Sequence, residues 1–505
     1  MTDELIIVID AGTGGGRAVA VDHKGKVRAR AYQAWDYFEP PGLEVYGKEF
    51  HPAEFQKILA DCCRQVVSAV GPQNIKGVTT TGMRQACVFL DAAGEPIYAG
   101  PNRDVRGILY TDEVEERMGR DRAYEITGRW PPWMFAPSRY YWFVKEKPEL
   151  AARVRRVLMI NDWLVHWLSG RAVAEPTNAA ESLLYDINRQ TWSRELLAAM
   201  EMSPEWMPEL APCGAVVGKV TKAAAQLTGI PAGTPVITGM ADTQAALLAG
   251  AVLEPGETGI VAGSTAPVMM VMNEPRPDPG QRLWIGCHPR PGRWVAESNA
   301  GDAGLIARGY IEGHLAAVSG DVAAAYQAAE KWAGEVPAGA SGVKAFLGPV
   351  IWDLTRMTPA VRAGVFFPYP VRDENAGPGN VVRAILENIG FALRANLDQA
   401  AELAGEPTRV VIAGGMTRSR VFCRIVAAML GKPLEVVTEP EATALGCAMT
   451  GFFALKVYPD LETAATEMKG EPELIEPDPG DQDEYNDLYG QWREEYNVMM
   501  GLTEE

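Results

Sequence analysis

The chain has 505 residues and a formal net charge of −18, with hydrophobic and charged shares of 47% and 22%. These shares are typical of a globular protein, and the length fits two large domains or three ordinary ones. The negative charge argues against a nucleic-acid partner, and no apolar run reaches the roughly 18 residues that a membrane span requires.

The first predicted elements form a hairpin around a glycine-rich turn. Residues 5–9 (LIIVI) are typical of a buried strand, 10–16 (DAGTGGG) of a turn and 17–21 (RAVAV) of a return strand. The segment carries acids where a secretory signal would carry bases, so we interpret it as a strand and expect a cytoplasmic protein.

A similar unit recurs later in the chain. Residues 258–262 and 267–271 indicate two strands around a polar turn at 263–265. Two further strands end in glycine-rich corners, at 235–242 and 409–416. The order of hairpin, then strand with a glycine corner, therefore occurs twice and indicates two related domains. The units share a pattern and not identity, which leaves coincidence open.

Helical patterns lie between and after these strands. They cover residues 244–251, 380–403, 420–430 and 482–500. Alternating strands and helices predict a layered α/β architecture. A turn-like segment at 253–257 marks the best boundary, so we expect domains at 1–253 and 254–505.

The turn after Asp10 has the composition of a phosphate-binding loop. Gly12, Thr13, Gly14 and Gly15 would let backbone amides approach phosphate oxygens, and the carboxylate before them could hold a hydrated magnesium ion. The spacing is neither that of a Walker P-loop nor that of a dinucleotide fingerprint, because a strand follows. A tight hairpin turn would also explain the glycines.

Two later corners are candidate nucleotide contacts. Gly263-Ser264-Thr265 is a second candidate phosphate loop, for which a plain hairpin turn is the alternative. Gly414-Gly415-Met416-Thr417 leads into a helix, where glycines allow a flat ligand such as adenine to lie on the backbone. Close packing of strand on helix is the alternative here.

Asp242 is the candidate general base. It ends a strand and precedes a helix of small residues, and an acid in such a crevice could take the proton of an attacking hydroxyl. A helix N-cap aspartate is the alternative. Seven cysteines and five histidines are scattered without CxxC spacing, which predicts reduced thiols and no zinc site.

Two polar clusters before Asp242 have the groups that a polyhydroxylated ligand needs. They are Met83-Arg84-Gln85, after a predicted strand, and the run from Asn102 to Arg106, which includes Asp104. Paired donors and acceptors at a few fixed points recognise hydroxyl groups. Surface ion pairing is the alternative.

Taken together, these segments resemble the FGGY family of carbohydrate kinases, in the family's order and over nearly the whole chain. The matching segments are residues 10–17 (first phosphate motif), 239–251 (catalytic segment), 258–266 (second phosphate motif) and 410–419 (adenosine motif), with the two family signatures at 137–142 and 364–390. Arg139 stands in the first signature where lysine is usual.

The resemblance implies two actin-like (ribonuclease H-like) ATPase domains with ATP and Mg²⁺ in the cleft between them. The domain at 1–253 would bind substrate and the domain at 254–505 the nucleotide. Asp242 would be the base, and Asp10 and Asp242 would hold the metal. Substrate contacts would come from Met83, Arg84, Gln85, Asn102, Asp104, Asp242, Thr243 and Gln244. ATP contacts would come from Gly12, Thr13, Gly14, Gly15, Arg17, Gly263, Ser264, Thr265, Gly414, Gly415, Met416 and Ser419.

Within the family, the chain is similar to an autoinducer-2-kinase-like subgroup. Asn102 stands where many members carry tryptophan, and Met83-Arg84, residues 161–164 and residues 175–178 also match the subgroup. This implies a short linear ketose or polyol as substrate, with xylulokinase-like activity as the alternative. An actin-like ATPase or a silent sugar-binding regulator is the alternative from another class. The sequence leaves a homodimer open.

Overall fold

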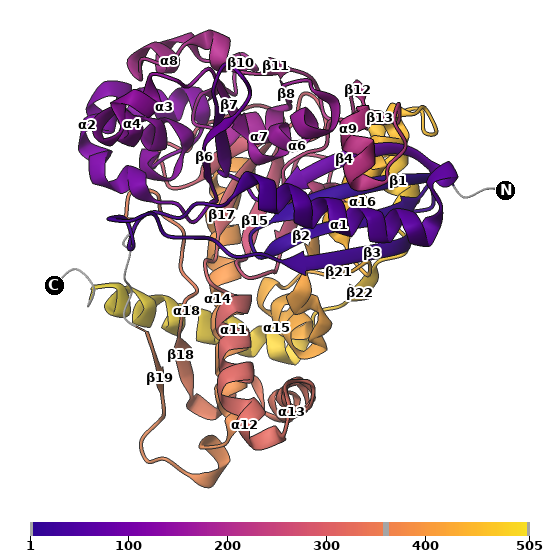
Figure 1. Cartoon of the computed structure of the whole chain (residues 1–505). Coiled ribbons are helices and arrows are strands. Elements are labelled where there is room, and N and C mark those ends of the chain that lie inside the picture. The colour runs from indigo at the N-terminus through magenta and orange to yellow at the C-terminus, as the bar shows by residue number, and fades with distance from the viewer. Residues whose placement is uncertain (1–3, 357–362, 502–505) are drawn as a thin grey trace.

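A computed structural model describes residues 4–356 and 363–501 of the chain. The outer ends of the two expected domains, at residues 1–3 and 502–505, lie outside the described residues. Two large β-sheets with helices on their faces form the framework (Figure 1), which confirms the predicted α/β class. Within the described ranges, no helix is both long enough and apolar enough to cross a membrane.

The first sheet has six strands in the order β12-β13-β4-β1-β2-β3. Their bounds are β1 (Leu5–Gly12), β2 (Gly15–Asp22), β3 (Val27–Ala34), β4 (Ile75–Gly82), β12 (Val216–Lys219) and β13 (Pro235–Ile237). Strand β1 pairs antiparallel with β2 and parallel with β4. The nearly continuous burial of Ile, Val and Ala along β1 and β2 fits strands covered on both faces.

The second sheet has seven strands in the order β16-β17-β15-β14-β20-β21-β22. Their bounds are β14 (Glu257–Val261), β15 (Pro267–Met272), β16 (Trp284–Cys287), β17 (Trp294–Asn299), β20 (Arg409–Ala413), β21 (Leu434–Val436) and β22 (Glu473–Ile475). Strand β14 pairs antiparallel with β15 and parallel with β20, so its neighbours repeat the arrangement around β1. The two sheets therefore have the same pattern of strand pairing around their central strands.

Two helices of small residues lie between the sheets. Helix α10 (Asp242–Ala249) packs against α16 (Ala442–Ala454), and α16 in turn covers β1 and β4 of the first sheet while α10 contacts β14 of the second. A Cβ at Gly446 would lie 1.9 Å from the Ala245 carbonyl oxygen, so the two backbones can approach only because residue 446 is glycine.

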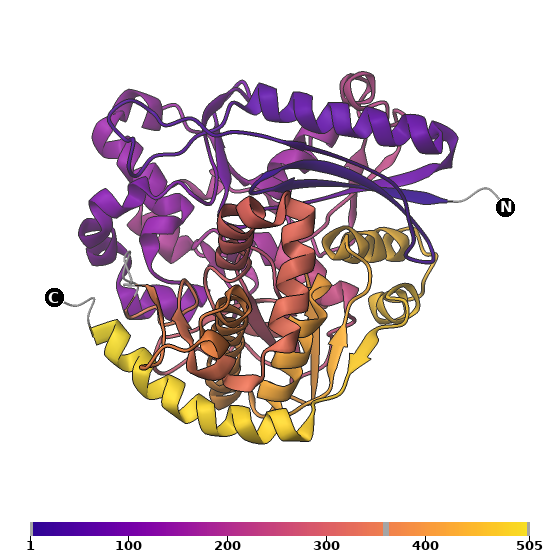
Figure 2. The ribbon, with the colours of Figure 1, turned by 90° about the horizontal axis from the view of Figure 1, so that it is seen from below.

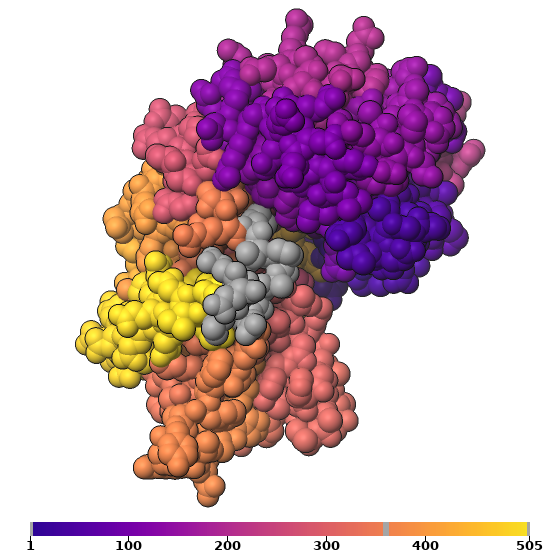
Figure 3. All heavy atoms as spheres, turned by 90° about the vertical axis from the view of Figure 1, so that its left-hand side faces the viewer, coloured from indigo at the N-terminus to yellow at the C-terminus, as the bar shows by residue number. Residues whose placement is uncertain are grey.

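The outer faces of the sheets are covered by longer helices. Helix α1 (Pro52–Val70) covers β2 and β3, and α14 (Pro378–Ala404) covers β15 and β17. Helix α15 (Arg420–Leu430) has the bounds predicted from the sequence, and α18 (Pro479–Gly501) packs on it along the outer side of the C-terminal half (Figure 2). In the space-filling view the N-terminal half forms the upper lobe and most of the C-terminal half the lower one (Figure 3).

Shorter elements complete the two halves. The remaining helices are α2 (Thr111–Met118), α3 (Arg120–Thr127), α4 (Ala136–Glu146), α5 (Pro148–Ala151), α6 (Ile160–Ser169), α7 (Pro176–Ala180), α8 (Arg194–Ala199), α9 (Lys222–Thr228), α11 (Gly304–Tyr310), α12 (Ala316–Ser319), α13 (Val322–Glu335) and α17 (Leu461–Met468). Small sheets pair β5 (Cys87–Leu90) with β6 (Pro96–Gly100) and β7 (Arg156–Met159), β8 (Val173–Ala174) with β11 (Glu209–Leu210), β9 (Tyr185–Asp186) with β10 (Thr191–Trp192), and β18 (Lys344–Phe346) with β19 (Gly364–Phe366). All seven cysteines are buried free thiols, as predicted.

Candidate active site

The glycine-rich turn is the two-residue tip of the β1–β2 hairpin. Gly12 faces Gly15 in the strand register, which leaves Thr13 and Gly14 at the tip. Tyrosines brace this tip: the Tyr37 hydroxyl donates to the Thr13 carbonyl at 2.6 Å, and the Tyr32 hydroxyl donates to the Gly14 carbonyl at 3.0 Å. The tip is therefore a fixed main-chain surface, as a phosphate cradle requires.

Asp10 lies at the end of β1 with one carboxylate oxygen unpaired. Its Oδ2 lies 3.2 Å from Nε of Arg17, whereas Oδ1 is buried without a hydrogen-bond partner. Burial raises the pKa of Asp10; Arg17 opposes this shift, and Glu441 from the C-terminal half adds to it. A buried oxygen without a donor is costly unless a cation or a water occupies the space before it.

Asp242 is the first residue of α10 rather than its N-cap. Ala241 occupies the N-cap position and the helix has no side-chain cap, so the alternative of an N-cap aspartate is wrong. The Asp242 Oδ1 accepts a hydrogen bond from the Thr243 N–H at 2.8 Å. Burial, above all, raises the pKa of Asp242 to about 7, with Asp10 raising it further and Arg84 lowering it. A carboxyl group with this pKa can accept a proton near neutral pH.

Asp10 and Asp242 are the candidate ligands for a metal ion at this site. The described residues contain no cluster of three or more His, Cys, Asp or Glu side chains able to hold a metal. Two carboxylates from Asp10 and Asp242 would suit Mg²⁺, an ion that keeps several waters and binds substrate phosphates. The unpaired Oδ1 of Asp10 fits such an ion.

The second candidate phosphate loop is the turn between β14 and β15. The N–H of Gly304 donates to the Gly263 carbonyl, and the N–H of Leu305 donates to the Ser264 carbonyl, each at 3.1 Å. The start of α11 therefore fixes this turn through two backbone hydrogen bonds. The side chains of Ser264 and Thr265 are exposed, which leaves hydroxyl groups and amides accessible.

A polar pocket of about 510 Å³ of empty space lies beside this turn. Its lining residues are Gly414, Gly415, Thr417, Arg418, Arg420, Val436, Val437, Thr438, Glu439 and Pro440. Gly414 has a φ of 111°, and a Cβ there would lie 2.5 Å from the Ala262 carbonyl oxygen, so only glycine fits. The glycine floor leaves the backbone open to a flat ring, which suits a nucleoside.

Of the four ATP contacts predicted at this corner, Met416 and Ser419 lie outside the lining of the pocket. The Met416 N–H donates to the Ala262 carbonyl at 3.1 Å, which ties the corner to the second phosphate turn. Ser419 is the N-cap of α15: its hydroxyl accepts from the Phe422 N–H and donates to Glu330 at 2.6 Å. Ser419 therefore has a structural role in the arrangement described.

Four of the eight predicted substrate residues form two pairs that differ in their free polar atoms. Met83 is buried in the N-terminal core, and the Asp104 carboxylate is taken up by Arg106 and by the Tyr98 hydroxyl. Asn102 and Gln244 keep free polar atoms: Asn102 Nδ2 donates to the Thr13 hydroxyl at 3.0 Å while its Oδ1 lacks a partner, and Gln244 Nε2 is also unpaired. Asn102 and Gln244 therefore keep polar atoms that can bind a ligand.

Arg84 and Gln85 belong to a buried ionic cluster that sequence reasoning missed. Its other members are Glu181, Arg129 and Glu297, and Glu297 comes from β17 in the other half of the chain. The signal in the sequence was an acid inside a strand of otherwise apolar and small residues, WVAESN. The Arg84 charge reaches Asp242, since it lowers the pKa of that carboxyl group.

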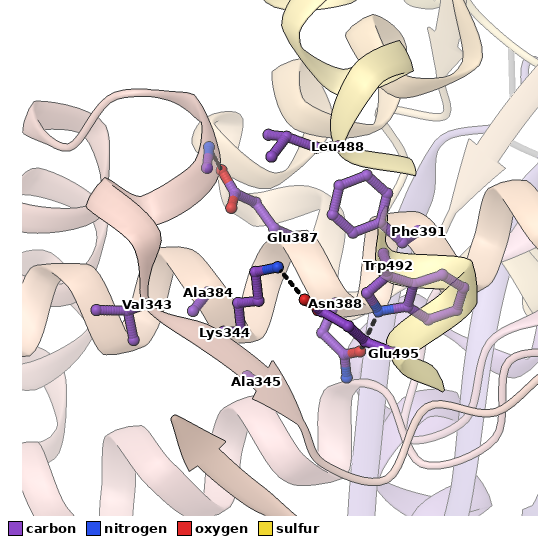
Figure 4. Close-up of a pocket in the computed structure, with 11 residues that line it drawn as sticks. Val343, Lys344, Ala345, Ala384, Glu387, Asn388, Phe391, Leu488, Trp492 and Glu495 are labelled. Carbon is purple, nitrogen blue, oxygen red and sulfur yellow. Dashed lines mark hydrogen bonds and ion pairs between the residues drawn. The ribbon is translucent and has the colours of Figure 1, made fainter. Parts of the chain in front are cut away.

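A second pocket lies wholly in the C-terminal half (Figure 4). It contains about 370 Å³ of empty space between β18, α14 and α18, with Phe391, Leu488 and Trp492 as its apolar wall. None of the predicted site residues lines it. It is therefore separate from the candidate site residues.

Comparisons with known proteins place the sequence in a family. The sequence models of the FGGY family of carbohydrate kinases match residues 5–249 (N-terminal domain) and 259–455 (C-terminal domain). The chain is 27% identical over 512 residues to the autoinducer-2 kinase of Escherichia coli strain K12 / DH10B, covering 99% of this chain and 95% of that protein.

Solved structures give the same fold. The crystal structure of xylulose kinase from Rhodospirillum rubrum matches with a TM-score of 0.86 at 25% identity, over 99% of this chain and 100% of that one. That of gluconate kinase from Lactobacillus acidophilus matches with a TM-score of 0.86 at 18% identity, over 99% of this chain and 98% of that one.

Proposed function

The chain belongs to the FGGY family of carbohydrate kinases, and from this premise we propose that it transfers the γ-phosphate of ATP to a hydroxyl of a short linear ketose or polyol. ATP-dependent sugar phosphorylation is the activity of the family. The observation that carries the proposal is the buried carboxyl group of Asp242, at the start of the helix α10 that packs against α16 of the other half of the chain. Burial and the charge of Asp10 raise the pKa of this group to about 7.

In the proposed reaction, Asp242 accepts the proton of the attacking hydroxyl. The hydroxyl oxygen forms a bond to the γ-phosphorus, the bond from that phosphorus to the β–γ bridging oxygen breaks, and ADP leaves. The amides of Gly12–Gly15 and Gly263–Thr265 would bind the phosphates, and the pocket at Gly414 the nucleoside. Mg²⁺, held by Asp10 and Asp242, would neutralise phosphate charge.

Acceptor recognition is assigned to the first half of the chain. Asn102 and Gln244, which keep unpaired polar atoms, and Arg84, whose charge lowers the pKa of Asp242, would bind hydroxyls. Asp104 and Met83 would position this wall without touching the acceptor. The autoinducer-2 kinases and the R. rubrum xylulose kinase favour a short ketose or polyol, and a xylulokinase-like activity is the alternative. The gluconate kinase has the same fold, so the fold alone leaves the charge of the acceptor open.

The test is a coupled assay of ADP release with ATP, Mg²⁺ and a panel of polyols, ketoses and the autoinducer-2 precursor. We expect release that depends on one class of uncharged acceptor and stops when Mg²⁺ is chelated. Release that no acceptor stimulates would instead support an actin-like ATPase. A cytoplasmic location, where ATP is supplied, is part of the proposal, and light scattering would show whether the protein is a homodimer.

A further inference from the structure

We infer that Glu297 determines the charge class of the acceptor, because it neutralises Arg84 and so makes the pocket select uncharged polyhydroxylated compounds over sugar acids. The inference rests on the proposed function. It assigns a specificity role to a residue of the second sheet, whereas the acceptor wall comes otherwise from the first half of the chain.

The contact between Glu297 and Arg84 is bidentate and buried. Arg84 Nη1 lies 2.6 Å from Glu297 Oε2, and Nη2 lies 2.7 Å from Oε1. Arg84 is 9% exposed and Glu297 is 1% exposed. Paired parallel hydrogen bonds of this kind fix both the position and the charge of a guanidinium group. Near the candidate base, whose pKa its charge lowers, Arg84 is therefore part of a neutralised pair instead of a free cation.

The rest of the cluster is also balanced in charge. Arg129 Nη2 donates to Glu181 Oε1 at 2.6 Å, and Arg84 Nη1 lies 3.5 Å from the same oxygen. Both guanidinium groups lie over the ring of Trp284. The ring centroid is 5.7 Å from Cζ of Arg84 and 5.2 Å from Cζ of Arg129. Two arginines thus meet two glutamates. The next charges, Asp242 and Asp10, are acids.

This balance has a chemical consequence for the acceptor. A carboxylate placed near Arg84 would find its cation already paired and would face the acids at Asp242 and Asp10, whereas hydroxyl groups carry no such penalty. Removing the charge of Glu297 would leave a buried arginine with one strong partner fewer. A carboxylate ligand would then relieve the unpaired charge.

The experiment compares acceptors that share a carbon skeleton and differ in charge. Xylitol and xylonate are tested with the wild type and with Glu297→Gln, by ADP release and by calorimetric binding. Glu297→Asp keeps the charge, and Glu195→Gln removes a charge from an exposed ion pair with Arg122 as the matched control. Thermal unfolding reports whether each variant is folded.

We expect the wild type to prefer xylitol at least tenfold, and Glu297→Gln to shift the xylonate-to-xylitol ratio by at least tenfold toward xylonate. Glu297→Asp and the control should keep the wild-type ratio. A folded Glu297→Gln with the wild-type ratio would overturn the inference. If Glu297→Gln does not fold, a wild type that binds xylonate as tightly as xylitol overturns it, and the tenfold preference supports it.

Failure of the proposed function gives a different result. In that case no acceptor on a wider panel of uncharged and acidic compounds is phosphorylated by the wild type. Calorimetry still decides the role of Glu297, because xylonate should bind Glu297→Gln at least tenfold more tightly than the wild type, and equal binding would contradict the inference.

Discussion

The Thr177 hydroxyl accepts a 2.8 Å hydrogen bond from the backbone N–H of Ala241, the residue immediately before Asp242. The same hydroxyl donates to Glu175 Oε2 at 2.7 Å, and Glu175 also caps α7 through the N–H groups of Thr177 and Asn178. A buried chain of hydrogen bonds therefore fixes the start of α10 and, with it, the direction of the candidate base.

Thr177→Val should disturb this positioning without touching the acceptor. The substitution keeps the shape but leaves the Ala241 N–H unsatisfied, which costs roughly 1–3 kcal/mol for a buried donor. We expect kcat to fall about tenfold, a shift of ~1.4 kcal/mol in the barrier, with a smaller change in KM. Thr177→Ser should restore kcat. A variant whose stability falls while kcat stays at the wild-type value would assign the bond to stability alone.

Asp242→Asn should remove nearly all turnover and spare nucleotide binding. The amide cannot accept the hydroxyl proton, and general-base catalysis is typically worth about 10² to 10⁴ in rate. We expect kcat to fall by at least about 10² while calorimetry shows ATP affinity within a few-fold of the wild type. Wild-type turnover in this variant would remove Asp242 from the role of base.

The pH dependence of activity should report the same carboxyl group. Because the base must be ionised and its pKa is raised to about 7, kcat/KM should rise with pH and level off above pH 7. The residual activity of Asp242→Asn should not show this rise of kcat/KM with pH. A profile that is flat from pH 5 to pH 8 would contradict the assignment.

The folding stability that Asp242 contributes should fall as pH rises, whereas kcat/KM rises. The raised pKa means that the folded state holds this proton where the unfolded chain, with a pKa of 3.8, has lost it. The contribution of Asp242 to stability is thus full below pH 4 and is lost as pH rises through about 7. Asp242→Asn should therefore gain stability relative to the wild type between pH 4 and 7 in urea unfolding, and the gain should level off above pH 7.

Much of the framework could be predicted because it leaves a local signal. The hairpin strands, the glycine corners and α15 follow from short runs of apolar residues and their breakers. The ionic contacts between the two halves leave no local signal in the sequence. Arg84 and Glu297 are 213 positions apart, and Arg17 and Glu441 are 424 positions apart. Asp104 was predicted as a ligand because donors surround it in the sequence, and in the fold its carboxylate pairs with one of them, Arg106, and with the distant Tyr98 hydroxyl.

Gly446→Ala tests whether the close contact of α10 and α16 places Asp242. Its added methyl group would meet the Ala245 carbonyl oxygen at 1.9 Å, so the two helices must move apart. Overpacking of this kind costs roughly 1–3 kcal/mol of stability. Because Asp242 begins α10, we also expect kcat to fall, and denaturant unfolding with steady-state kinetics measures both effects.

The matched control is Gly490→Ala, an exposed position within α18 where an added Cβ meets nothing within 4 Å. Alanine there should stabilise the helix by about 0.5–1 kcal/mol and leave kcat unchanged, because only the intrinsic helix preference is altered. If both variants gave the same small gain in stability, the α10–α16 contact would not be as tight as the described geometry requires. If Gly446→Ala alone lost stability but kept its kcat, the helix contact would hold the two halves together without orienting the base.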